Sequence, residues 1–284
     1  MQTIAPKTPV ARESAASATI SLAFSRHWPE YLMEAAALGT FMVSACAFVV
    51  LFEHPSSPVH QSFEGASMLR RSLIGLAMGL TAIGIIYSPW GQRSGAHMNP
   101  AVTLTFLSLG KIARWDALFY VTFQFLGGIA GVLVANLLIG PALQDATVNY
   151  AVTVPGPGGP WIAFVAEFVI SMLMMSMVLW ISNSRRLSRY TPLFAGALIS
   201  TFITFEAPLS GMSMNPARTV GSAFHAGEWT ALWIYFVAPT MAMLLASVLY
   251  RFRKGAHRVF CAKLHHCNNQ PCIFNCRYGD LNVQ

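Results

Sequence analysis

The sequence predicts an all-α integral membrane protein, with six transmembrane helices plus two half-helices in two inverted repeats. Three observations predict this class. The composition is 55% hydrophobic and only 10% charged, whereas soluble domains carry about 25% charged residues. Several stretches are apolar over the roughly 20 residues that a helix needs to cross a bilayer. The tripeptide Asn-Pro-Ala also occurs twice, at 99–101 and 215–217.

Six stretches with at most one charged residue are the predicted spans. They cover 35–52, 72–92, 117–144, 161–184, 190–205 and 229–250. The fifth is short, and we expect it to continue through Pro208. The predicted organisation is a polar tail at 1–28, a membrane domain at 29–255 with repeats at about 29–140 and 160–255, and a second tail at 256–284.

Basic residues predict the orientation of the chain. The first 28 residues contain Lys7, Arg12 and Arg26 but no apolar core, which argues against a cleaved signal peptide. Six spans leave both termini on one side, and most Lys and Arg residues fall on that side. The positive-inside rule therefore predicts cytoplasmic termini. This bias explains the net charge of +7, so a nucleic-acid partner is not needed.

Each Asn-Pro-Ala copy lies in a longer repeat, SGAHMNPAVT at 94–103 and SGMSMNPART at 210–219. An odd number of predicted spans separates the copies, so the halves have opposite orientations, as in other membrane proteins with inverted repeats and broken helices. The apolar stretches that follow each copy reach only about half of a ~30 Å hydrocarbon core. Each ends at a glycine, Gly110 or Gly227, a common helix terminator.

The motif residues are Asn99, Pro100 and Ala101, and Asn215, Pro216 and Ala217. Proline at the first helical position loses no hydrogen bond. An asparagine cap accepts from the helix through its carbonyl oxygen and keeps its NH2 group to donate elsewhere. Two such caps at the midplane would offer donors to a passing oxygen, beside helix ends worth about +0.5 charge each, and would repel cations. The alternative is an ordinary Asn-Pro turn, which a matched second copy disfavours.

The chain resembles the aquaporin and glycerol-facilitator family, as a bacterial-type, water-channel-like member, over residues 28–252. The resemblance is carried by the two decapeptides, Gln124 with Gly127, Glu167 with Phe168, and the run Val237-Ala238-Pro239. It implies one pore per protomer, a homotetramer and a location in the cell (plasma or inner) membrane. It also implies passive permeation of water and of small neutral solutes such as glycerol, exclusion of protons and ions, no required cofactor and no enzymatic activity.

Two acidic residues lie within predicted helices, Glu34 and Glu167. The resemblance implies that each braces an Asn-Pro-Ala loop from inside the bundle. Because an unpaired buried acid is costly, we expect both to accept hydrogen bonds from backbone N–H groups or hydroxyls. Glu34 precedes Thr40 by six residues, where the family usually has four. The alternative for Glu34 is a position at the membrane interface, reaching towards water.

Arg218 is the one charged residue in the second half-helix, and Val102 occupies the matching position in the first. The resemblance implies that Arg218 lines the narrowest constriction, where it donates hydrogen bonds to solutes and repels cations. The alternative is an ion pair with an acid such as Glu206. For Glu206 itself we expect a bracing role near the same loop.

The resemblance places the other constriction residues by their spacing from the two asparagines, at Gly79, Ile203 and Met212. This trio matches neither the pattern of water-specific members (Phe, His and a small residue) nor that of glycerol facilitators (Trp, Gly and Phe). Flanking residues such as Thr219 favour the water branch. We therefore predict water permeation with leakage of small neutral solutes.

His97 precedes Asn99 by two residues. The resemblance implies that its backbone carbonyl lines the cytoplasmic half of the pore, and a pH-gating imidazole is the alternative. Gly127, Gly128 and Gly131 predict close helix contact, within a protomer or between protomers.

The C-terminal tail concentrates thiols and imidazoles that suit a soft metal, most readily zinc. These residues are Cys261, His265, His266, Cys267, Cys272 and Cys276. Disulfides are rare in the cytoplasm, but the spacings do not match paired C-x2-C motifs. The alternatives are free thiols or a basic tail that binds anionic lipid.

Two other classes of function remain open. A secondary transporter also uses inverted repeats, but it would need an intramembrane ion site, and the spans offer only Glu34 and Glu167. A metal-sensing membrane protein would act through the tail. An enzyme is disfavoured because neither HExxH nor GxSxG is present.

Overall fold

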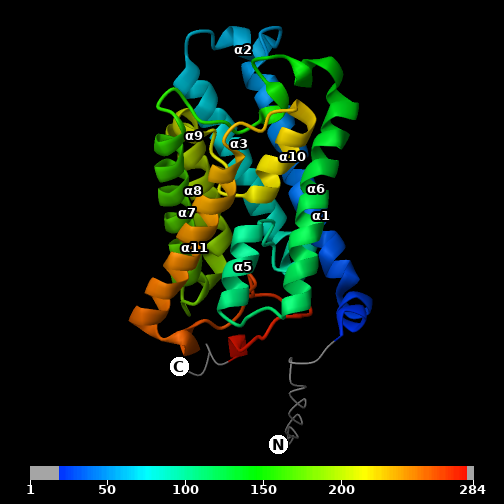
Figure 1. Ribbon diagram of the computed structural model, residues 1–284, viewed down its shortest axis with the longest axis vertical. Coiled ribbons are helices and arrows are strands. Elements are labelled where there is room, and N and C mark those ends of the chain that lie inside the picture. The colour runs from blue at the N-terminus through cyan, green and yellow to red at the C-terminus, as the bar shows by residue number, and fades with distance from the viewer. Residues whose placement is uncertain (1–18, 280–284) are drawn as a thin grey trace, which may run out of the picture.

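The computed structural model describes residues 19–279, and within them it is all-helical (Figure 1). The first half contains α1 (Ile20–Glu53), α2 (Pro58–Ser62), α3 (Ser67–Tyr87), α4 (Pro89–Ser94), α5 (Pro100–Ser108) and α6 (Arg114–Ile139). The second half contains α7 (Pro160–Ser182), α8 (Thr191–Phe205), α9 (Ala207–Ser210), α10 (Pro216–Ala226) and α11 (Leu232–Lys254). Single turns of 3-10 helix are η1 (Gly140–Gln144), η2 (Asn149–Ala151), η3 (Ser188–Tyr190) and η4 (Ala256–Arg258).

Five of the described helices are long and apolar enough to cross a membrane: α1, α3, α6 continued by η1, α7 and α11. The remaining predicted span is α8, which has only 15 residues. The prediction that it continues through Pro208 is wrong, because the helix ends at Phe205 and the separate turn α9 follows. A proline ring clashes with the carbonyl four residues earlier, here that of Thr204, so an unbroken helix through Pro208 is disfavoured.

The first helix begins earlier than predicted. Thr19 caps α1, since its hydroxyl accepts a hydrogen bond from the N–H of Leu22. Residues 20–28, predicted as part of a polar tail, therefore belong to α1. The rest of that predicted tail, 1–18, lies outside the described residues.

The two halves repeat one packing plan. In the first half α1 packs along α6, and in the second α7 packs along α11, while α3 and α8 pack together across the halves. Figure 1 shows α5 in the lower half of the bundle and α10 in the upper half. We call the two ends of the bundle the α2 end and the tail end, after the segments that lie there (Figure 1). The start of α1 and residues 256–279 are both at the tail end.

Close approach of α1 and α6 depends on glycine. A Cβ atom on Gly127 would lie 2.3 Å from the carbonyl oxygen of Ala35, and one on Gly131 would lie 2.5 Å from that of Gly39. Neither space admits a side chain. The glycine pattern of α6 thus serves helix contact within the protomer, the first of the two alternatives that the sequence left open.

Candidate functional site

The loops before the two half-helices have the same strained backbone. Three residues of each loop have positive φ, and for the two that are not glycine this region costs about 1–2 kcal/mol and persists only where surrounding contacts hold it. They are Gly95 (96°), Ala96 (54°) and Met98 (49°) in the first loop, and Gly211 (79°), Met212 (50°) and Met214 (55°) in the second. The strain is the same in both halves, so the contacts that hold it should also be repeated.

Glu34 supplies those contacts for the first loop. Its Oε1 accepts from the Ser94 hydroxyl at 2.7 Å and from the His97 N–H at 3.1 Å. Its Oε2 accepts from the Met98 N–H at 2.6 Å and from the Gln124 amide at 2.9 Å. The Glu34 side chain is fully buried, so the interfacial alternative for this residue is wrong.

Glu167 repeats the arrangement in the second loop. Its Oε1 accepts from the Ser210 hydroxyl at 2.8 Å and from the Ser213 N–H at 2.6 Å. Its Oε2 accepts from the Met214 N–H at 2.7 Å. The expectation that both buried acids find backbone N–H and hydroxyl partners is confirmed.

Two tyrosines complete the bracing, and the sequence analysis missed them. The Tyr120 hydroxyl donates to the Ser94 carbonyl at 2.6 Å, and the Tyr235 hydroxyl donates to the Ser210 carbonyl at 2.6 Å. Tyr120 follows Ser94 by 26 residues and Tyr235 follows Ser210 by 25. This repeated spacing was the signal that could have found them.

The asparagines cap the half-helices as predicted. The Asn99 side-chain oxygen accepts from the Ala101 N–H at 2.9 Å, and that of Asn215 accepts from the Ala217 N–H at 3.0 Å. Glycines with positive φ, Gly110 and Gly227, follow the ends of α5 and α10. The half-helices therefore begin and end where their sequence signals lie.

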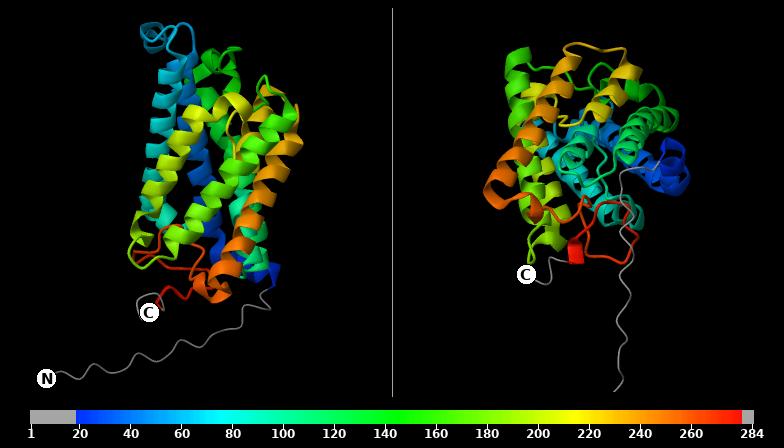
Figure 2. Two further views of the ribbon diagram at one scale, coloured as in Figure 1. Left: turned by 90° about the vertical axis from the view of Figure 1, so that its left-hand side faces the viewer. Right: turned by 60° about the horizontal axis from the view of Figure 1, so that its bottom comes forward.

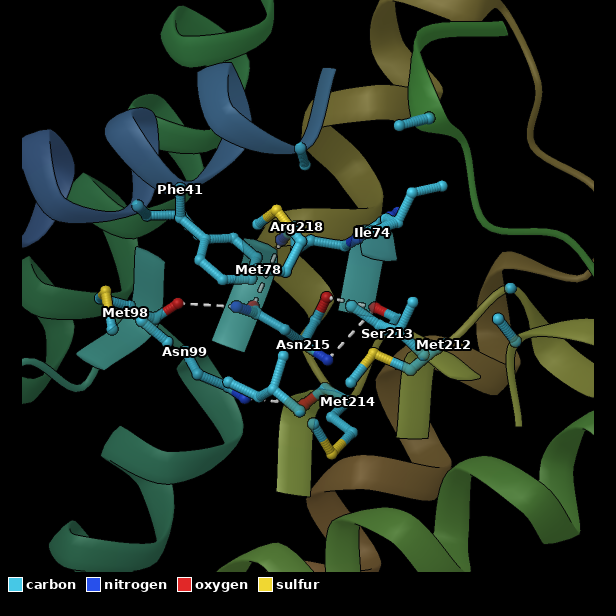
Figure 3. Close-up of a pocket in the computed structure, with 18 of the residues that line it drawn as sticks. Phe41, Ile74, Met78, Met98, Asn99, Met212, Ser213, Met214, Asn215 and Arg218 are labelled. Carbon is cyan, nitrogen blue, oxygen red and sulfur yellow. Dashed lines mark hydrogen bonds between the residues drawn. The ribbon is translucent and has the colours of Figure 1, made fainter. Parts of the chain in front are cut away.

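The two asparagine amides are bonded to each other's loops. Asn99 Nδ2 donates to the Met214 carbonyl at 2.7 Å, and Asn215 Nδ2 donates to the Met98 carbonyl at 2.7 Å. These bonds hold the start of each half-helix against the other (Figure 3). An NH2 group has two hydrogens, so each amide keeps a second N–H for a ligand. The sequence analysis did not foresee that one hydrogen would be used in this way.

Both asparagines line one cavity of about 470 Å³ that runs through the bundle. Residues from the α2 end, including Glu53 and Arg71, line one extreme, and Leu264 of the tail lines the other. Two predicted constriction residues, Ile203 and Met212, line it as well.

Gly79 does not line this cavity, contrary to its predicted place. A Cβ on Gly79 would lie 2.5 Å from the carbonyl oxygen of Gly196, so the residue faces α8 and lets the two helices approach. The preceding residue, Met78, lines the cavity together with Ile74 and Phe41 (Figure 3).

Arg218 lines the cavity, and its Nη1 is buried without a hydrogen-bond partner among residues 19–279. The alternative pairing with Glu206 does not occur, since the ion pairs of the described chain involve other residues. Glu206 instead shares the Ser210 hydroxyl with Glu167, in keeping with the expected bracing role. Arg218 therefore places a positive charge in the cavity wall.

His97 lines the cavity, and its ring nitrogens are both engaged. Nδ1 lies 3.0 Å from the Thr103 hydroxyl oxygen. Nε2 lies 2.9 Å from the Ala262 carbonyl oxygen and must donate to it, because a carbonyl only accepts.

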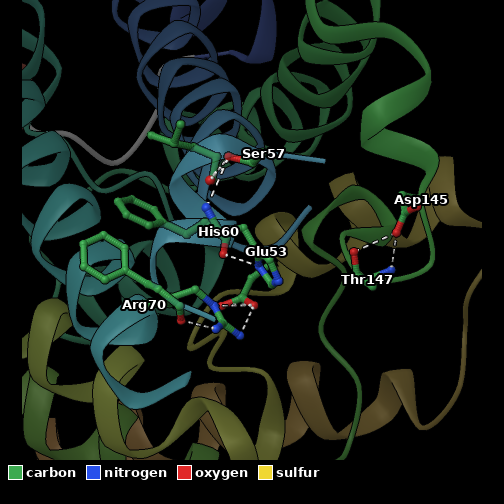
Figure 4. A network of polar contacts seen from close by, with 9 residues as sticks. Glu53, Ser57, His60, Arg70, Asp145 and Thr147 are labelled. Atoms are coloured by element: carbon green, nitrogen blue, oxygen red, sulfur yellow. Dashed lines mark hydrogen bonds and ion pairs between the residues drawn. The ribbon is translucent and has the colours of Figure 1, made fainter. Parts of the chain in front are cut away.

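At the α2 end, a polar network fixes the loop beside the cavity (Figure 4). Arg70 donates to Glu53 Oε2 through Nε at 3.2 Å and Nη2 at 3.1 Å, and to the Phe63 carbonyl at 2.9 Å. Asp145 accepts from the hydroxyl of Thr147 at 2.7 Å. Glu53 and Thr147 both line the cavity, so the network shapes its mouth.

Four of the six predicted metal ligands come together in what we call the tail cluster: Cys261, His266, Cys272 and Cys276. Their donor atoms all lie within 4.8 Å of one another. The other two predicted ligands are corrected. Cys267 is exposed and lies beside the Tyr278 hydroxyl, and His265 packs edge-on against Tyr87.

Hydrogen bonds within the tail cluster shift the pKa values of two of its members, Cys276 and His266. Hydrogen bonds from Cys261 and Cys272 lower the pKa of the Cys276 thiol, which favours its thiolate. Burial disfavours the charged form of His266, but its hydrogen bonds to Cys272 and Cys276 outweigh burial and raise its pKa to about 9. A thiolate within a group of soft donors is the form of cysteine that binds metals.

Comparisons with known proteins agree with this architecture. Aquaporin NIP2-1 of Oryza sativa subsp. japonica is 34% identical over 192 residues, which are 66% of this chain and 62% of the relative. Aquaporin A of Dictyostelium discoideum is 32% identical over 192 residues, covering 66% of this chain and 67% of the relative. The chain thus spans just under two thirds of the rice relative's length. The X-ray structure of the aquaglyceroporin from Plasmodium falciparum superposes with a TM-score of 0.66 at 19% identity, covering 79% of this chain and 95% of that one, and supports the fold.

The fold and site define an integral membrane protein whose two inverted halves meet at paired asparagine caps inside one cavity. The sequence pattern of the major intrinsic protein family matches residues 21–250, and the chain belongs to that family.

Proposed function

We propose that the protein is a passive transmembrane channel for water that also admits small neutral solutes such as glycerol, and that it excludes protons and ions. The observation that carries the proposal is the crossed pair of amides, Asn99 with Met214 and Asn215 with Met98, at the wall of one continuous cavity. The aquaporins among its relatives support the same conclusion.

The mechanism follows from the two caps. A water oxygen beside Asn99 and Asn215 accepts their second N–H groups, and its hydrogens point away from both. The N-termini of α5 and α10 add about half a positive charge each at the same place. Cations and hydronium therefore meet an electrostatic barrier that neutral molecules do not.

Arg218 acts as a second filter towards the α2 end. Its guanidinium lies in the cavity wall without an ion-pair partner among residues 19–279, and its charge repels cations. The neighbouring wall is apolar, formed by Met78, Ile203 and Met212. An apolar wall beside one positive charge favours small neutral molecules over cations.

The transporter alternative is disfavoured because the intramembrane acids are already engaged. Glu34 accepts four hydrogen bonds and Glu167 accepts three, all from the loops and helices that they brace. Neither carboxylate is left to couple an ion to transport. The proposal involves no chemical reaction, and water transport needs no cofactor; zinc enters only as a structural ion of the tail.

Stopped-flow light scattering tests the proposal. Vesicles reconstituted with the purified chain, with and without a metal chelator, should shrink faster than protein-free vesicles after an osmotic step. Shrinkage no faster than that of protein-free vesicles in both conditions would reject water transport.

Met78→Ala is expected to raise glycerol permeation by about tenfold relative to water, since small changes in an apolar pocket shift discrimination by 1–3 kcal/mol. Leu80→Ala is the matched control, because Leu80 lies on the same helix but is 58% exposed. Glycerol and water permeation are measured on the same vesicles. Equal ratios in both variants would remove Met78 from the filter.

We also propose that the tail end faces the cytoplasm of the plasma or inner membrane, and that four copies assemble into a homotetramer. The positive-inside rule supports the orientation, and family membership supports the assembly. Exposed Cys267 offers a labelling site, so impermeant thiol reagents should reach it only from the cytoplasmic side. Native mass spectrometry measures the assembly, and a monomer there would contradict it.

A further inference from the structure

The tail, residues 259–279, lies across one end of the bundle and is bonded to the first Asn-Pro-Ala loop (Figure 2). The Leu264 N–H donates to the Gly95 carbonyl at 3.1 Å. The His97 ring donates to the Ala262 carbonyl at 2.9 Å. The tail therefore contacts the loop whose neighbouring residues line the cavity.

An aromatic contact adds to these bonds. The Phe274 ring stacks on His97, with centroids 5.3 Å apart and planes 12° apart, and meets Tyr120 edge-on. A Cβ on Gly95 would lie 2.7 Å from the Phe274 ring. The loop surface is thus shaped to receive this ring.

Further anchors reach both halves of the bundle. Asn275 donates its side-chain amide to the Gly110 carbonyl at 2.8 Å and its backbone N–H to the Lys111 carbonyl at 2.9 Å. On the other half, the Phe260 N–H donates to the Asn183 side chain at 2.8 Å. The tail therefore contacts both halves of the bundle at this end.

One side chain of the tail reaches the cavity. Leu264 lines the cavity beside His97 and Met98, and it is only 7% exposed. Among the described tail residues, Leu264 is the one in the cavity wall. An apolar side chain at the end of a water path is an obstacle to water.

The tail has little regular structure of its own to hold this shape. Between η4 and Tyr278 it contains only bends and irregular chain, and residues 278–279 are in 3-10 helix. Ordering an irregular chain costs about 1–2 kcal/mol per residue in backbone entropy. A cross-link would offset that cost, and the tail cluster lies where a cross-link is needed.

The tail cluster brackets Leu264 and Phe274 along the sequence. Cys261 and His266 stand on either side of Leu264, and Cys272 and Cys276 stand on either side of Phe274. A single ion bound by all four would fix both short loops at once.

The donor set suits zinc. Cys261 and Cys272 Sγ atoms lie 3.5 Å apart, and Cys276 Sγ lies 3.0 Å from His266 Nε2. Tetrahedral zinc with bonds of about 2.3 Å to sulfur and 2.0–2.1 Å to nitrogen would place these pairs about 3.8 Å and 3.6 Å apart. Small outward shifts would therefore accommodate the ion. Three thiolates with one imidazole is an established closed, structural zinc set.

We propose that Cys261, His266, Cys272 and Cys276 bind one zinc ion, which holds Leu264 in the mouth of the channel and Phe274 against the first Asn-Pro-Ala loop, and so keeps the channel shut. Removal of zinc frees the tail and opens the pore. This regulation rests on the proposed water channel, whereas the metal site does not.

Metal content tests the site without reference to transport. Full-length protein is purified under reducing conditions, and zinc is measured by elemental analysis. Wild type and the control Cys267→Ser should carry about one zinc per chain, and Cys272→Ser should carry almost none. Equal zinc in the two variants, or a Cys261–Cys272 disulfide found by mass spectrometry in the wild type, would overturn the site.

Water permeability tests the gate. Zinc-loaded wild type and Cys267→Ser should be slow, and chelation should speed both by about fivefold or more, the usual lower range of allosteric coupling. Leu264→Gly keeps the four ligands, so it should conduct with zinc bound, and it remains informative if Cys272→Ser fails to fold.

The outcomes separate the two proposals. Zinc-bound wild type that conducts as fast as chelated wild type overturns the gate and leaves the channel standing. Absence of water flow in chelated wild type and in folded Leu264→Gly rejects the channel itself, whatever the zinc content.

Discussion

Replacing Arg218 with valine is expected to let cations and protons leak through the protein. The change copies Val102, the matching residue of the first half. A unit charge about 4 Å from a passing cation opposes it by about 4 kcal/mol at an effective dielectric of 20, and each 1.4 kcal/mol is a factor of ten in rate. We therefore expect at least about tenfold more cation and proton leak, measured with a pH-sensitive dye and a potassium gradient in chelated vesicles.

Glycerol permeation should rise in the same variant, because the guanidinium no longer narrows the path. Arg186→Val is the control for net charge, since Arg186 is exposed on the loop after α7. A leak equal to wild type in Arg218→Val would mean that the paired half-helices alone exclude ions.

Replacing Glu167 with alanine is expected to destabilise the membrane domain. The Ser213 and Met214 N–H groups would lose their acceptor while buried, whereas the Ser210 hydroxyl would keep Glu206. Each unsatisfied buried donor costs about 1–3 kcal/mol, so the loss from these two donors is at least about 2 kcal/mol. Thermal unfolding in detergent should show a much lower midpoint and poor recovery of folded protein.

Glu64→Ala is the matched control, because Glu64 is exposed on the loop between α2 and α3. Glu167→Gln should lie between them, since it keeps one oxygen but sets an NH2 group against backbone N–H groups. A melting point for Glu167→Ala equal to that of the control would show that the second loop holds its backbone without the carboxylate.

Local chemistry was predictable from the sequence. The caps at Asn99 and Asn215 depend on a side chain and the next two residues, so the motif alone predicts them. The bracing acids followed from the cost of burying a charge, which demands partners for Glu34 and Glu167. In both cases a single side chain needs hydrogen-bond partners, and the Asn-Pro-Ala loops supply them.

Constriction residues that were placed by their spacing along the sequence were predicted less accurately. One residue turns the side chain by about 100° around an α-helix, which has 3.6 residues per turn. The spacing from Asn99 selected Gly79, which faces α8, whereas Met78, one residue earlier, lines the cavity. The turn α4 lies within that spacing, and the sequence analysis did not foresee it.

The structure of the tail could not be predicted from the sequence, for a different reason. Its irregular chain has no period, so nothing in the sequence distinguishes His266 from its neighbour His265 as a member of the tail cluster. Its contacts with Gly95 and Lys111 also join residues far apart in the chain. Only the folded arrangement reveals which thiols converge and what they cover.

The reciprocal amide bonds at the centre have a consequence for assembly of the chain. Each half supplies a donor, Asn99 or Asn215, and an acceptor, the carbonyl of Met98 or Met214, but it cannot satisfy its own donor. The junction closes only after both halves have entered the bilayer. One half expressed alone could complete such a centre only by pairing with a second copy inserted the opposite way, as a dual-topology dimer.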